Sequence, residues 1–499
     1  MWGTVLYVFQ SVGKAVALTL AATFLYLLLC VLYNYLFHPL RRFPGPLLWR
    51  ITPFPRAVAL FRGTLALDVA KFQRRYGPVV RIGPSELAFI TADAWKDVYG
   101  APATGDEENP KDYRFYRLVK SAPPSIINAN FEEHSRLRHW LSHGFSDRSL
   151  QAQQGIIGGY VDLLIKRLRE RCNNGQTPLN MKEWLNWTTF DIIGNLGFGS
   201  DFGCLENVTY APWILNINDA MKKGAIVQAL AYIGLTPIIQ WLVEKAQSGY
   251  VAHREFARLK VEQRIELSSS RPDFLEGLLD KGLGIPQLGS IASTLLIAGS
   301  ETSATLLSGA LYLLTTHPDT LKKLTHEVRS TFKNEEEINL LSVRKLPYML
   351  ACLKESLRKC FDPPVANGMP RVAKPGGTTV AGYHVPEGTT IAVWQWAINH
   401  NSEYWSDPYS FEPERWTGGD PRFSNDRLDA AQPFLLGHRG CIGQTLAYAE
   451  MRLILARIVY AFDLRLSDES RDWISVQKNY VLWEKPDLGI YLTPATIKS

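Results

Sequence analysis

The fold of this chain is decided by the stretch Pro433-Phe434-Leu435-Leu436-Gly437-His438-Arg439-Gly440-Cys441-Ile442-Gly443, which a helical pattern follows as far as Tyr460. Its spacing is Phe-x-x-Gly-x-Arg-x-Cys-x-Gly. A cysteine just before a helix lies near unpaired backbone N–H groups and the positive end of the helix dipole, and both favour the thiolate. We therefore expect Cys441 to be a thiolate that can bind a metal.

The other fixed positions of this stretch suit a flat, iron-containing ligand. Gly437 can adopt a backbone conformation that other residues avoid, as a bulge or tight turn requires. Gly443 has no side chain, so a planar group can lie against the first helical turn. Arg439 can bind a carboxylate beside that group with its guanidinium fork, and Phe434 can cover the sulfur. Together these residues predict a haem whose iron is bound by Cys441.

The same stretch resembles the haem-binding signature of the cytochrome P450 superfamily, the haem-thiolate monooxygenases. From Gln432 to Arg452 it is most similar to fungal microsomal enzymes of secondary metabolism. The resemblance implies a mainly α-helical fold with small β-sheets, preceded by one N-terminal transmembrane helix. It also implies haem b (iron protoporphyrin IX) with Cys441 as the axial ligand. No Cys-x-x-Cys-His motif is present, so we expect the haem to be bound non-covalently.

Composition excludes several other classes of protein. The chain has 499 residues, is 46% hydrophobic and carries a net charge of +6 without a basic cluster, which gives no indication of nucleic-acid binding. Its six cysteines show no paired spacing, which indicates a reducing compartment and no disulfide framework.

The N-terminal segment has the length and composition of a membrane anchor. Ala15 to Phe37 contains no charged side chain and is long enough, as a helix, to span the roughly 30 Å hydrocarbon core of a bilayer. Arg41 and Arg42 follow it and favour a cytoplasmic position for the rest of the chain. We expect residues 1–40 to be the anchor and residues 41–499 to form one catalytic domain.

Periodicity and turn residues predict four elements that bear on the site. Val79 to Ile90 has the pattern of a hairpin, and Thr378 to Val393 that of a second hairpin with Pro386-Glu387-Gly388 at its turn. Glu132 to about Ser146 and Leu288 to Thr316 have helical patterns, the second closed by His317-Pro318.

The resemblance assigns haem-propionate contacts to residues outside the cysteine stretch. His134 and Arg138 are four apart on one face of their predicted helix, where the family presents a Trp or His and an Arg to the propionates. An amphipathic helix with a solvated basic face is the alternative. Arg371, in Met369-Pro370-Arg371, occupies the place of another propionate-binding arginine.

The long predicted helix carries Ala298-Gly299-Ser300-Glu301-Thr302, which is similar to the family's Ala-Gly-x-(Asp/Glu)-Thr pattern. A glycine inside a helix costs about 1 kcal/mol relative to alanine, and clearance over the haem would explain Gly299. We expect Thr302 to hydrogen-bond dioxygen and Glu301 to relay protons to it. In the alternative, Thr302 bonds back to an upstream carbonyl and Glu301 forms a surface ion pair.

Glu355, Arg358 and Arg415 resemble the family's Glu-Arg-Arg triad. Two guanidinium groups on one buried carboxylate would fix the core around the cysteine loop, which is a structural role.

By resemblance, five segments line the substrate pocket, and most of their side chains are apolar or aromatic: Asn109 to Ile127, Trp213 to Tyr232, the helix before Thr302, Val365 to Met369, and Tyr480 to Trp483. We expect a monooxygenase that inserts one oxygen atom from O2 into a C–H bond of a terpenoid, polyketide or alkaloid. Its expected partners are NADPH-cytochrome P450 reductase and cytochrome b5, at the endoplasmic reticulum membrane. The alternatives are a haem-thiolate isomerase or dehydratase, and a membrane-tethered haem sensor or electron carrier.

Overall fold

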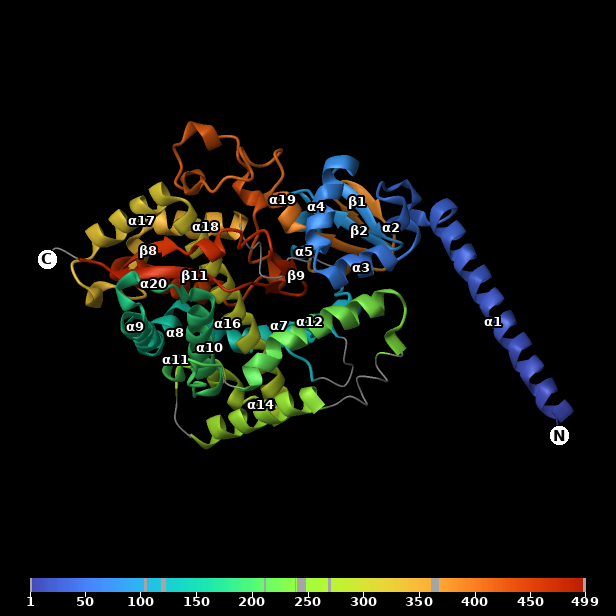
Figure 1. Cartoon of the computed structure of the whole chain (residues 1–499), viewed down its shortest axis with the longest axis horizontal. Coiled ribbons are helices and arrows are strands. Elements are labelled where there is room, and N and C mark those ends of the chain that lie inside the picture. The colour runs from blue at the N-terminus through green and yellow to red at the C-terminus, as the bar shows by residue number, and fades with distance from the viewer. Residues whose placement is uncertain are drawn as a thin grey trace.

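The computed structural model describes residues 2–102, 106–117, 123–210, 212–237, 239, 248–267, 271–359 and 368–496. This part of the chain is mostly helical and contains four small β-sheets. Figure 1 shows a broad helical body, with the sheet that contains β1 and β2 at its upper right and β8, β9 and β11 in its middle, and one long helix, α1 (Trp2–Leu36), that projects from it. The predicted fold class is confirmed.

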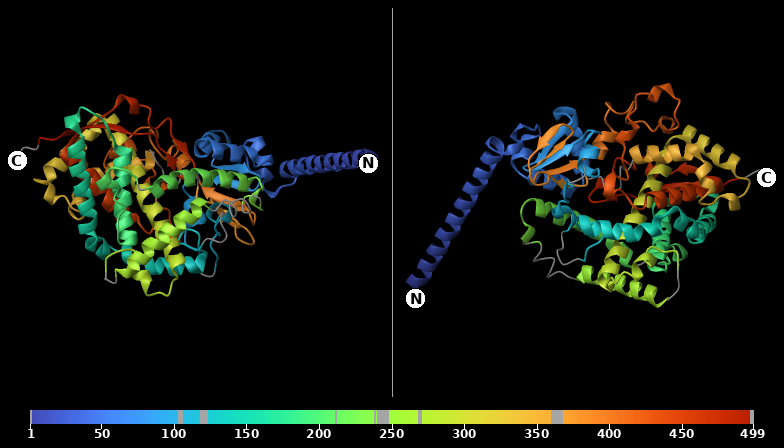
Figure 2. Two further views of the ribbon diagram at one scale, coloured as in Figure 1. Left: turned by 60° about the horizontal axis from the view of Figure 1, so that its bottom comes forward. Right: turned by 180° about the vertical axis from the view of Figure 1, so that it is seen from behind.

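Helix α1 is the candidate membrane anchor. Its segment Phe9–Leu36 has 28 residues, a mean hydropathy of 2.5 and no buried part. At 1.5 Å per residue such a helix exceeds the roughly 30 Å of a hydrocarbon core. In both views of Figure 2, α1 extends away from the body with the N-terminus at its tip. The helix begins earlier than the predicted Ala15 and ends close to the predicted Phe37.

A four-stranded sheet lies on the side of the body next to α1. Strands β1 (Val79–Gly83) and β2 (Glu86–Phe89) are antiparallel neighbours, which confirms the first predicted hairpin. Strand β7 (Thr390–Val393) pairs in parallel with β2, and β4 (Arg371–Val372) pairs with the other edge of β7. The sheet therefore joins the beginning of the body to its last quarter.

The second predicted hairpin has a different turn from the one expected. Strands β5 (Thr378–Val380) and β6 (Tyr383–Val385) form the hairpin around Ala381 and Gly382, whose φ values are +47° and +79°. Two left-handed residues give the tight turn that matches the twist of a two-residue hairpin. The expected turn at Pro386-Glu387-Gly388 instead leads from β6 into β7 of the other sheet.

Helix α16 (Ile285–Thr316) is the central element of the body, and its 32 residues agree with the predicted long helix. It has Pro286 in its first turn, where the missing N–H costs nothing, and it ends before His317-Pro318. Most of its side chains are buried. It contacts α10 (Met181–Phe198), α14 (Ser248–Glu266), α18 (Pro347–Lys359) and α20 (Gln444–Ala461).

The remaining elements complete the body around this helix. The longer helices are α3 (Phe54–Arg62), α4 (Leu65–Tyr76), α7 (Phe131–Ser142), α9 (Gln154–Arg171), α12 (Pro212–Tyr232) and α17 (Pro318–Thr331). The short helices are α2 (Leu47–Ile51), α5 (Ala94–Tyr99), α6 (Tyr113–Tyr116), α8 (Asp147–Ala152), α11 (Cys204–Asn207), α15 (Glu276–Leu279) and α19 (Gln395–Asn399). The other strands are β3 (Leu179–Asn180), β8 (Phe462–Leu466), β9 (Lys478–Asn479), β10 (Trp483–Glu484) and β11 (Gly489–Pro494).

Candidate active site

The cysteine loop is a tight backbone structure that ends at the first turn of α20. The Cys441 backbone N–H donates to the Phe434 carbonyl oxygen over 2.8 Å, and Gly437–Arg439 form one turn of 3-10 helix inside this loop. Gly437 has a φ of +71°, and a Cβ added there would lie 2.4 Å from the Tyr99 carbonyl oxygen. Glycine is therefore required at this position, as the sequence predicted.

Cys441 is a free cysteine and is exposed in the structure, although protein atoms close around its sulfur. Burial raises the pKa of Cys441, while the Gly443 backbone N–H and Arg138 act in the opposite direction. The backbone N–H at the start of α20 thus favours the thiolate, as predicted, while burial opposes it. A thiolate at Cys441 stays a prediction. A cation bound at the sulfur would reverse this balance.

Gly443 keeps the space beside the sulfur clear. A Cβ added to Gly443 would lie 4.0 Å from Cys441 Sγ and 3.8 Å from a ring carbon of Phe145. Such a methyl group would occupy the side of the sulfur on which a planar ligand can lie. The Phe434 ring packs against Tyr448 on α20, with 5.1 Å between the ring centroids.

Helix α7 brings His134 and Arg138 to the cysteine loop. Arg138 Nη1 donates to the Gly440 carbonyl oxygen over 2.6 Å, and the His134 ring lies 5.0 Å from the His438 ring. The Nδ1 atom of His134 is 2.9 Å from the Ile126 carbonyl oxygen, and burial lowers the pKa of His134 to about 4. The face shared by these two residues therefore points into the protein and not into solvent.

Cations and unpaired polar atoms gather next to the loop. Arg439 binds Glu108 through Nε and Nη2 at 2.7 to 3.0 Å, so its fork is occupied by a carboxylate of the chain itself. Burial, then Arg439 and Arg371, lower the pKa of Lys111 to about 6. With its pKa at about 6, Lys111 is mostly neutral at neutral pH, so Glu108 faces two cations, Arg439 and Arg371, and the cluster keeps an excess of one positive charge.

Three buried polar atoms in this neighbourhood have no hydrogen-bond partner: Arg371 Nη1, His134 Nε2 and the Tyr116 hydroxyl. Because His134 Nδ1 faces a carbonyl oxygen and carries the ring proton, Nε2 of the neutral ring is an acceptor, whereas the other two atoms can donate. Buried polar atoms without partners are rare in folded proteins and indicate a missing partner. Excess positive charge beside the donors of Arg371 and Tyr116 indicates a site for carboxylates. The sequence identified Arg371 and His134 but not Lys111, Tyr116 or Glu108, which belong to no recognised spacing.

Helix α16 carries Glu301 and Thr302 as neighbours. The Thr302 hydroxyl donates to the Ala298 carbonyl oxygen over 2.6 Å, which is the back-bonded arrangement of the alternative interpretation, and its side chain is half-buried. Glu301 is buried and forms an ion pair with Lys485, not a surface pair. Lys485 lies 184 residues away along the chain and carries no sequence signal for this contact.

Gly299 lies against α10. A Cβ added to Gly299 would lie 2.9 Å from Cδ1 and 3.1 Å from Cγ1 of Ile193, a residue of α10. Glycine here permits the close approach of α10 to α16, the helix pair with the most extensive contact in the described body. Clearance over the haem stays a prediction beside this packing.

The structure brings Glu355, Arg358 and Arg415 together in a network with fully buried side chains. Glu355 accepts hydrogen bonds from Arg358 Nη2 at 2.7 Å and from Arg415 Nε at 3.1 Å. The indole of Trp416 donates to its second oxygen over 2.8 Å. Asp426, which the sequence did not suggest, holds the other side of Arg415. Every charge of the network therefore has a partner.

Part of the predicted substrate lining lies outside the described residues, namely 118–122 and 365–367, and the side chains of 212–221 are not described. Of the rest, Tyr480, Leu482 and Trp483 line a hollow of about 270 Å³ whose floor includes Glu301.

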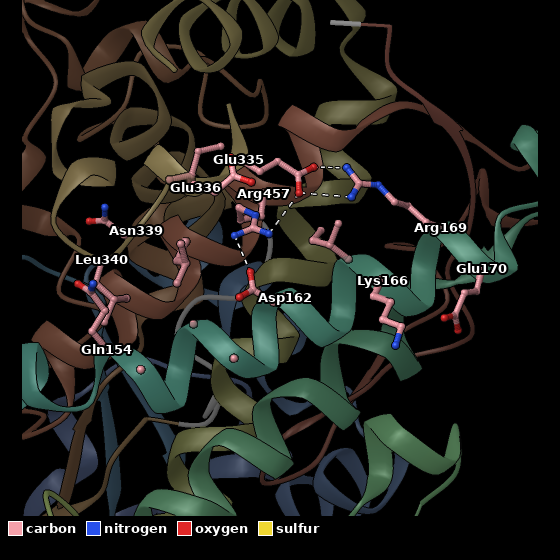
Figure 3. A pocket seen from close by; sticks show the side chains of 16 residues that line it. Gln154, Asp162, Lys166, Arg169, Glu170, Glu335, Glu336, Asn339, Leu340 and Arg457 are labelled. Carbon is pink, nitrogen blue, oxygen red and sulfur yellow. Dashed lines mark hydrogen bonds and ion pairs between the residues drawn. The ribbon is translucent and has the colours of Figure 1, made fainter. Parts of the chain in front are cut away.

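A separate recess of about 770 Å³ lies between α9, the 3-10 turn Glu335–Glu337 and α20 (Figure 3). Arg457 crosses it, bonded to Asp162 at 2.8 Å and to Glu335 at 3.4 Å, and Arg169 also binds Glu335. None of its lining residues belongs to the predicted site. These ion pairs hold α9 and α20 together, which explains why charged side chains line this recess.

Comparison with known families agrees with this geometry. The family model described as Cytochrome P450 matches residues 43–492. The cytochrome P450 monooxygenase tpeC of Talaromyces stipitatus is 43% identical over 99% of this chain and 97% of its own length.

Two further relatives have names that state a reaction. The trichothecene C-15 hydroxylase of Fusarium sporotrichioides is 42% identical over 97% of this chain and 99% of its own length. The averantin hydroxylase of Dothistroma septosporum is 41% identical over 96% of this chain and 91% of its own length.

Proposed function

The chain belongs to the cytochrome P450 family, a family of oxidoreductases with a cysteine-ligated haem, and from this premise we propose that it hydroxylates a hydrophobic secondary metabolite with Cys441 as the iron ligand. Haem b is the cofactor of the proposal. Residues 1–40 are its anchor and residues 41–499 its catalytic domain. The observation that carries the proposal is the Cys441 thiol, presented by its glycine-shaped loop beside the buried cation cluster.

The residues at this place fit a haem. The clearance at Gly443 suits the porphyrin plane, and the unpaired donor Arg371 Nη1 suits its propionates. His134 would donate to a propionate from Nε2 as the imidazolium, which a carboxylate beside it favours. Arg138 and Arg439 supply further positive charge, the second shared with Glu108. The ring of Phe434 shields the thiolate side. Haem held by Cys441 supplies the activation of O2 that puts one oxygen atom into a C–H bond of the substrate.

The side chains of α16 handle the protons of this reaction. The oxygen chemistry that a bound haem would supply consumes protons, and a hydroxyl next to an acid can supply them. Thr302 would hydrogen-bond O2 with its hydroxyl once the bond to the Ala298 carbonyl oxygen opens, and Glu301 would carry protons toward Thr302. Glu355, Arg358 and Arg415 hold the backbone that presents Cys441.

The substrate class and the partners are inferred from composition and from relatives. The predicted pocket segments are largely apolar, and two relatives are named as hydroxylases of a trichothecene and of averantin. A terpenoid, polyketide or alkaloid scaffold suits such a pocket. Electrons come from NADPH-cytochrome P450 reductase, with cytochrome b5 as a second donor, at the endoplasmic reticulum membrane where α1 anchors the chain.

The absorption spectrum of the dithionite-reduced protein under carbon monoxide tests the proposal. A strongly red-shifted Soret band is expected for the chain as purified, and its loss is expected in Cys441→Ala. A Soret band typical of histidine-ligated haem would refute the ligand assignment. Candidate scaffolds are then screened by the spin-state shift that they cause. Labelled O2 must appear in the product, which separates a monooxygenase from an isomerase or an electron carrier.

A further inference from the structure

A buried ion pair joins α16 to the segment that follows β10. Lys485 Nζ binds Glu301 Oε1 and also donates to the Thr305 hydroxyl over 2.5 Å. The side chains of Lys485 and Glu301 are only 3% and 5% exposed. Taking both charges out of water is costly, so a pair in this position must be well bonded to persist.

The two oxygens of Glu301 have different surroundings. Oε1 faces Lys485 and lies 3.4 Å from the Thr305 hydroxyl. Oε2 is buried and has no hydrogen-bond partner. A carboxylate that is held at one oxygen and free at the other can accept a proton or a water molecule at the free oxygen without losing its anchor.

A polar hollow of about 270 Å³ connects this pair with the surface. It is lined by residues of α10, the loop between α11 and α12, α12, α16 and the C-terminal segment: Lys182, Glu183, Asn186, Tyr210, Lys222, Glu301, Tyr480, Leu482, Trp483, Glu484 and Lys485. At its rim, Lys222 and Glu484 form an ion pair whose side chains are 45% and 47% exposed. Since a water molecule takes about 30 Å³ of liquid, the hollow holds several of them.

We propose that Lys485 is a positioning residue for proton delivery, which holds Glu301 ionised at the floor of a hydrated hollow so that protons enter between α10 and β10. The inference rests on the proposed function, because it assigns a route to the protons which that function consumes. A proton from bulk water binds Glu301 Oε2. It passes to the Thr302 hydroxyl, whose own proton moves to O2, while Lys485 stays an ammonium throughout.

The charge of Lys485 is what the proposal requires. A carboxyl group buried without a cation takes up a proton and becomes neutral. A Glu301 in that state would hold its proton too tightly to pass it on to Thr302. The ammonium beside Oε1 thus keeps Glu301 able to release each proton that it takes up at Oε2.

Infrared spectroscopy of the full-length, haem-loaded protein tests this directly. Lys485→Met should produce the C=O stretch of a protonated carboxyl, with a shift in D2O, and the double variant Lys485→Met/Glu301→Gln should lack it. Lys485→Arg keeps the charge and should show no such band. Lys478→Met on β9 is the matched control, because its side chain is exposed and does not line the hollow. Absence of the band in folded Lys485→Met overturns the inference, and Lys485→Gln serves if the Met variant does not fold.

Turnover with NADPH and a reductase gives the second measurement. In Lys485→Met, the fraction of consumed O2 that ends in product and not in peroxide should fall about tenfold. This is less than the roughly 10²–10⁴-fold typical for loss of an acid–base participant itself, because Glu301 and Thr302 remain. The solvent isotope effect should increase. Lys485→Arg should restore most of the product fraction. If Glu301→Gln loses product formation to peroxide and Lys485→Met does not, the inference about Lys485 is wrong while the proposed role of Glu301 stands. If Glu301→Gln is also normal, the proposed proton role of Glu301 fails with it.

Discussion

Arg138 donates a hydrogen bond of 2.6 Å from Nη1 to the carbonyl oxygen of Gly440, the residue that precedes Cys441. A side chain of α7 thus holds the backbone of a loop about 300 residues further along the chain. Arg138 also opposes the rise in the pKa of Cys441 that burial causes. One guanidinium therefore supports both the position and the charge of the proposed iron ligand.

Arg138→Leu should destabilise this loop. Loss of a hydrogen bond from a charged donor costs about 1.5–3 kcal/mol, so we expect weaker haem retention and a lower free energy of unfolding. Haem content after gel filtration and urea unfolding measure the two effects. Arg136→Leu is the control, because the Arg136 side chain is 56% exposed and its ion pair with Glu133 is long, at 3.8 Å. Equal losses in both variants would contradict the assignment.

Glu355→Gln should be among the most damaging single changes in the body. It leaves two buried guanidinium groups without their shared anion, which costs about 3–5 kcal/mol. Denaturant unfolding of the purified protein measures this. Glu412→Gln is the control. It removes only a half-exposed contact of 3.4 Å with Arg422 and should lower the free energy of unfolding by at most about 1 kcal/mol. A mild effect of Glu355→Gln would show that other bonds satisfy Arg358 and Arg415.

Gly437→Ala should disrupt the cysteine loop by contact as well as by conformation. Its Cβ would lie 2.4 Å from the Tyr99 carbonyl oxygen. Gly418 has a similar φ of +73° and open space around it, so Gly418→Ala bears only the left-handed backbone cost of about 1–2 kcal/mol. Haem content should fall in Gly437→Ala and remain in Gly418→Ala. Similar haem content in both would mean that the loop shifts without consequence.

His400 should make the protein sensitive to acid. Burial, and then Arg358, lower the pKa of His400 from 6.5 to about 3. Between these values the unfolded chain binds a proton that the folded protein excludes, so the free energy of unfolding falls as the pH decreases from 6.5 toward 3. The slope from one such group is at most about 1.4 kcal/mol per pH unit. The free energy of unfolding, measured by urea unfolding at each pH across this range, should depend less on pH in His400→Asn. His384→Asn is the control, because His384 is exposed.

Removal of residues 1–37 should separate anchoring from folding. Helix α1 projects from the body and has no buried part in Phe9–Leu36. The shortened protein should keep the spectrum of the full chain under carbon monoxide and move from the membrane to the soluble fraction after lysis. A protein that no longer binds haem would show that α1 also supports the fold.

Short motifs predicted much of the site, because their residues meet through local geometry. The turn at Gly437, the shared face of His134 and Arg138, and the pair Glu355 and Arg358 all follow from spacings of a few residues. Lys485 was not predictable, because its contact with Glu301 spans 184 residues and depends on the path of the C-terminal segment. Glu108 meets Arg439 across 331 residues and was missed for the same reason.

One error shows where local chemistry misleads. Pro386-Glu387-Gly388 has the composition of a turn, yet the hairpin closes at Ala381 and Gly382, because β7 is taken up by pairing with β2. A distant part of the chain thus sets the position of the turn.

The pairing of β2 with β7 also means that this part of the sheet can form only late in synthesis of the chain. Residues Glu86–Phe89 bond to Thr390–Val393, about 300 residues later. While the ribosome extends the chain, α1 and the β1–β2 hairpin emerge early, and the outer edge of β2 stays unpaired until most of the body has been synthesised. Unpaired strand edges associate readily with other chains. The nascent protein therefore exposes an aggregation-prone strand edge, close to its membrane anchor, for most of translation. We expect chaperones to affect the yield of folded protein most during that interval.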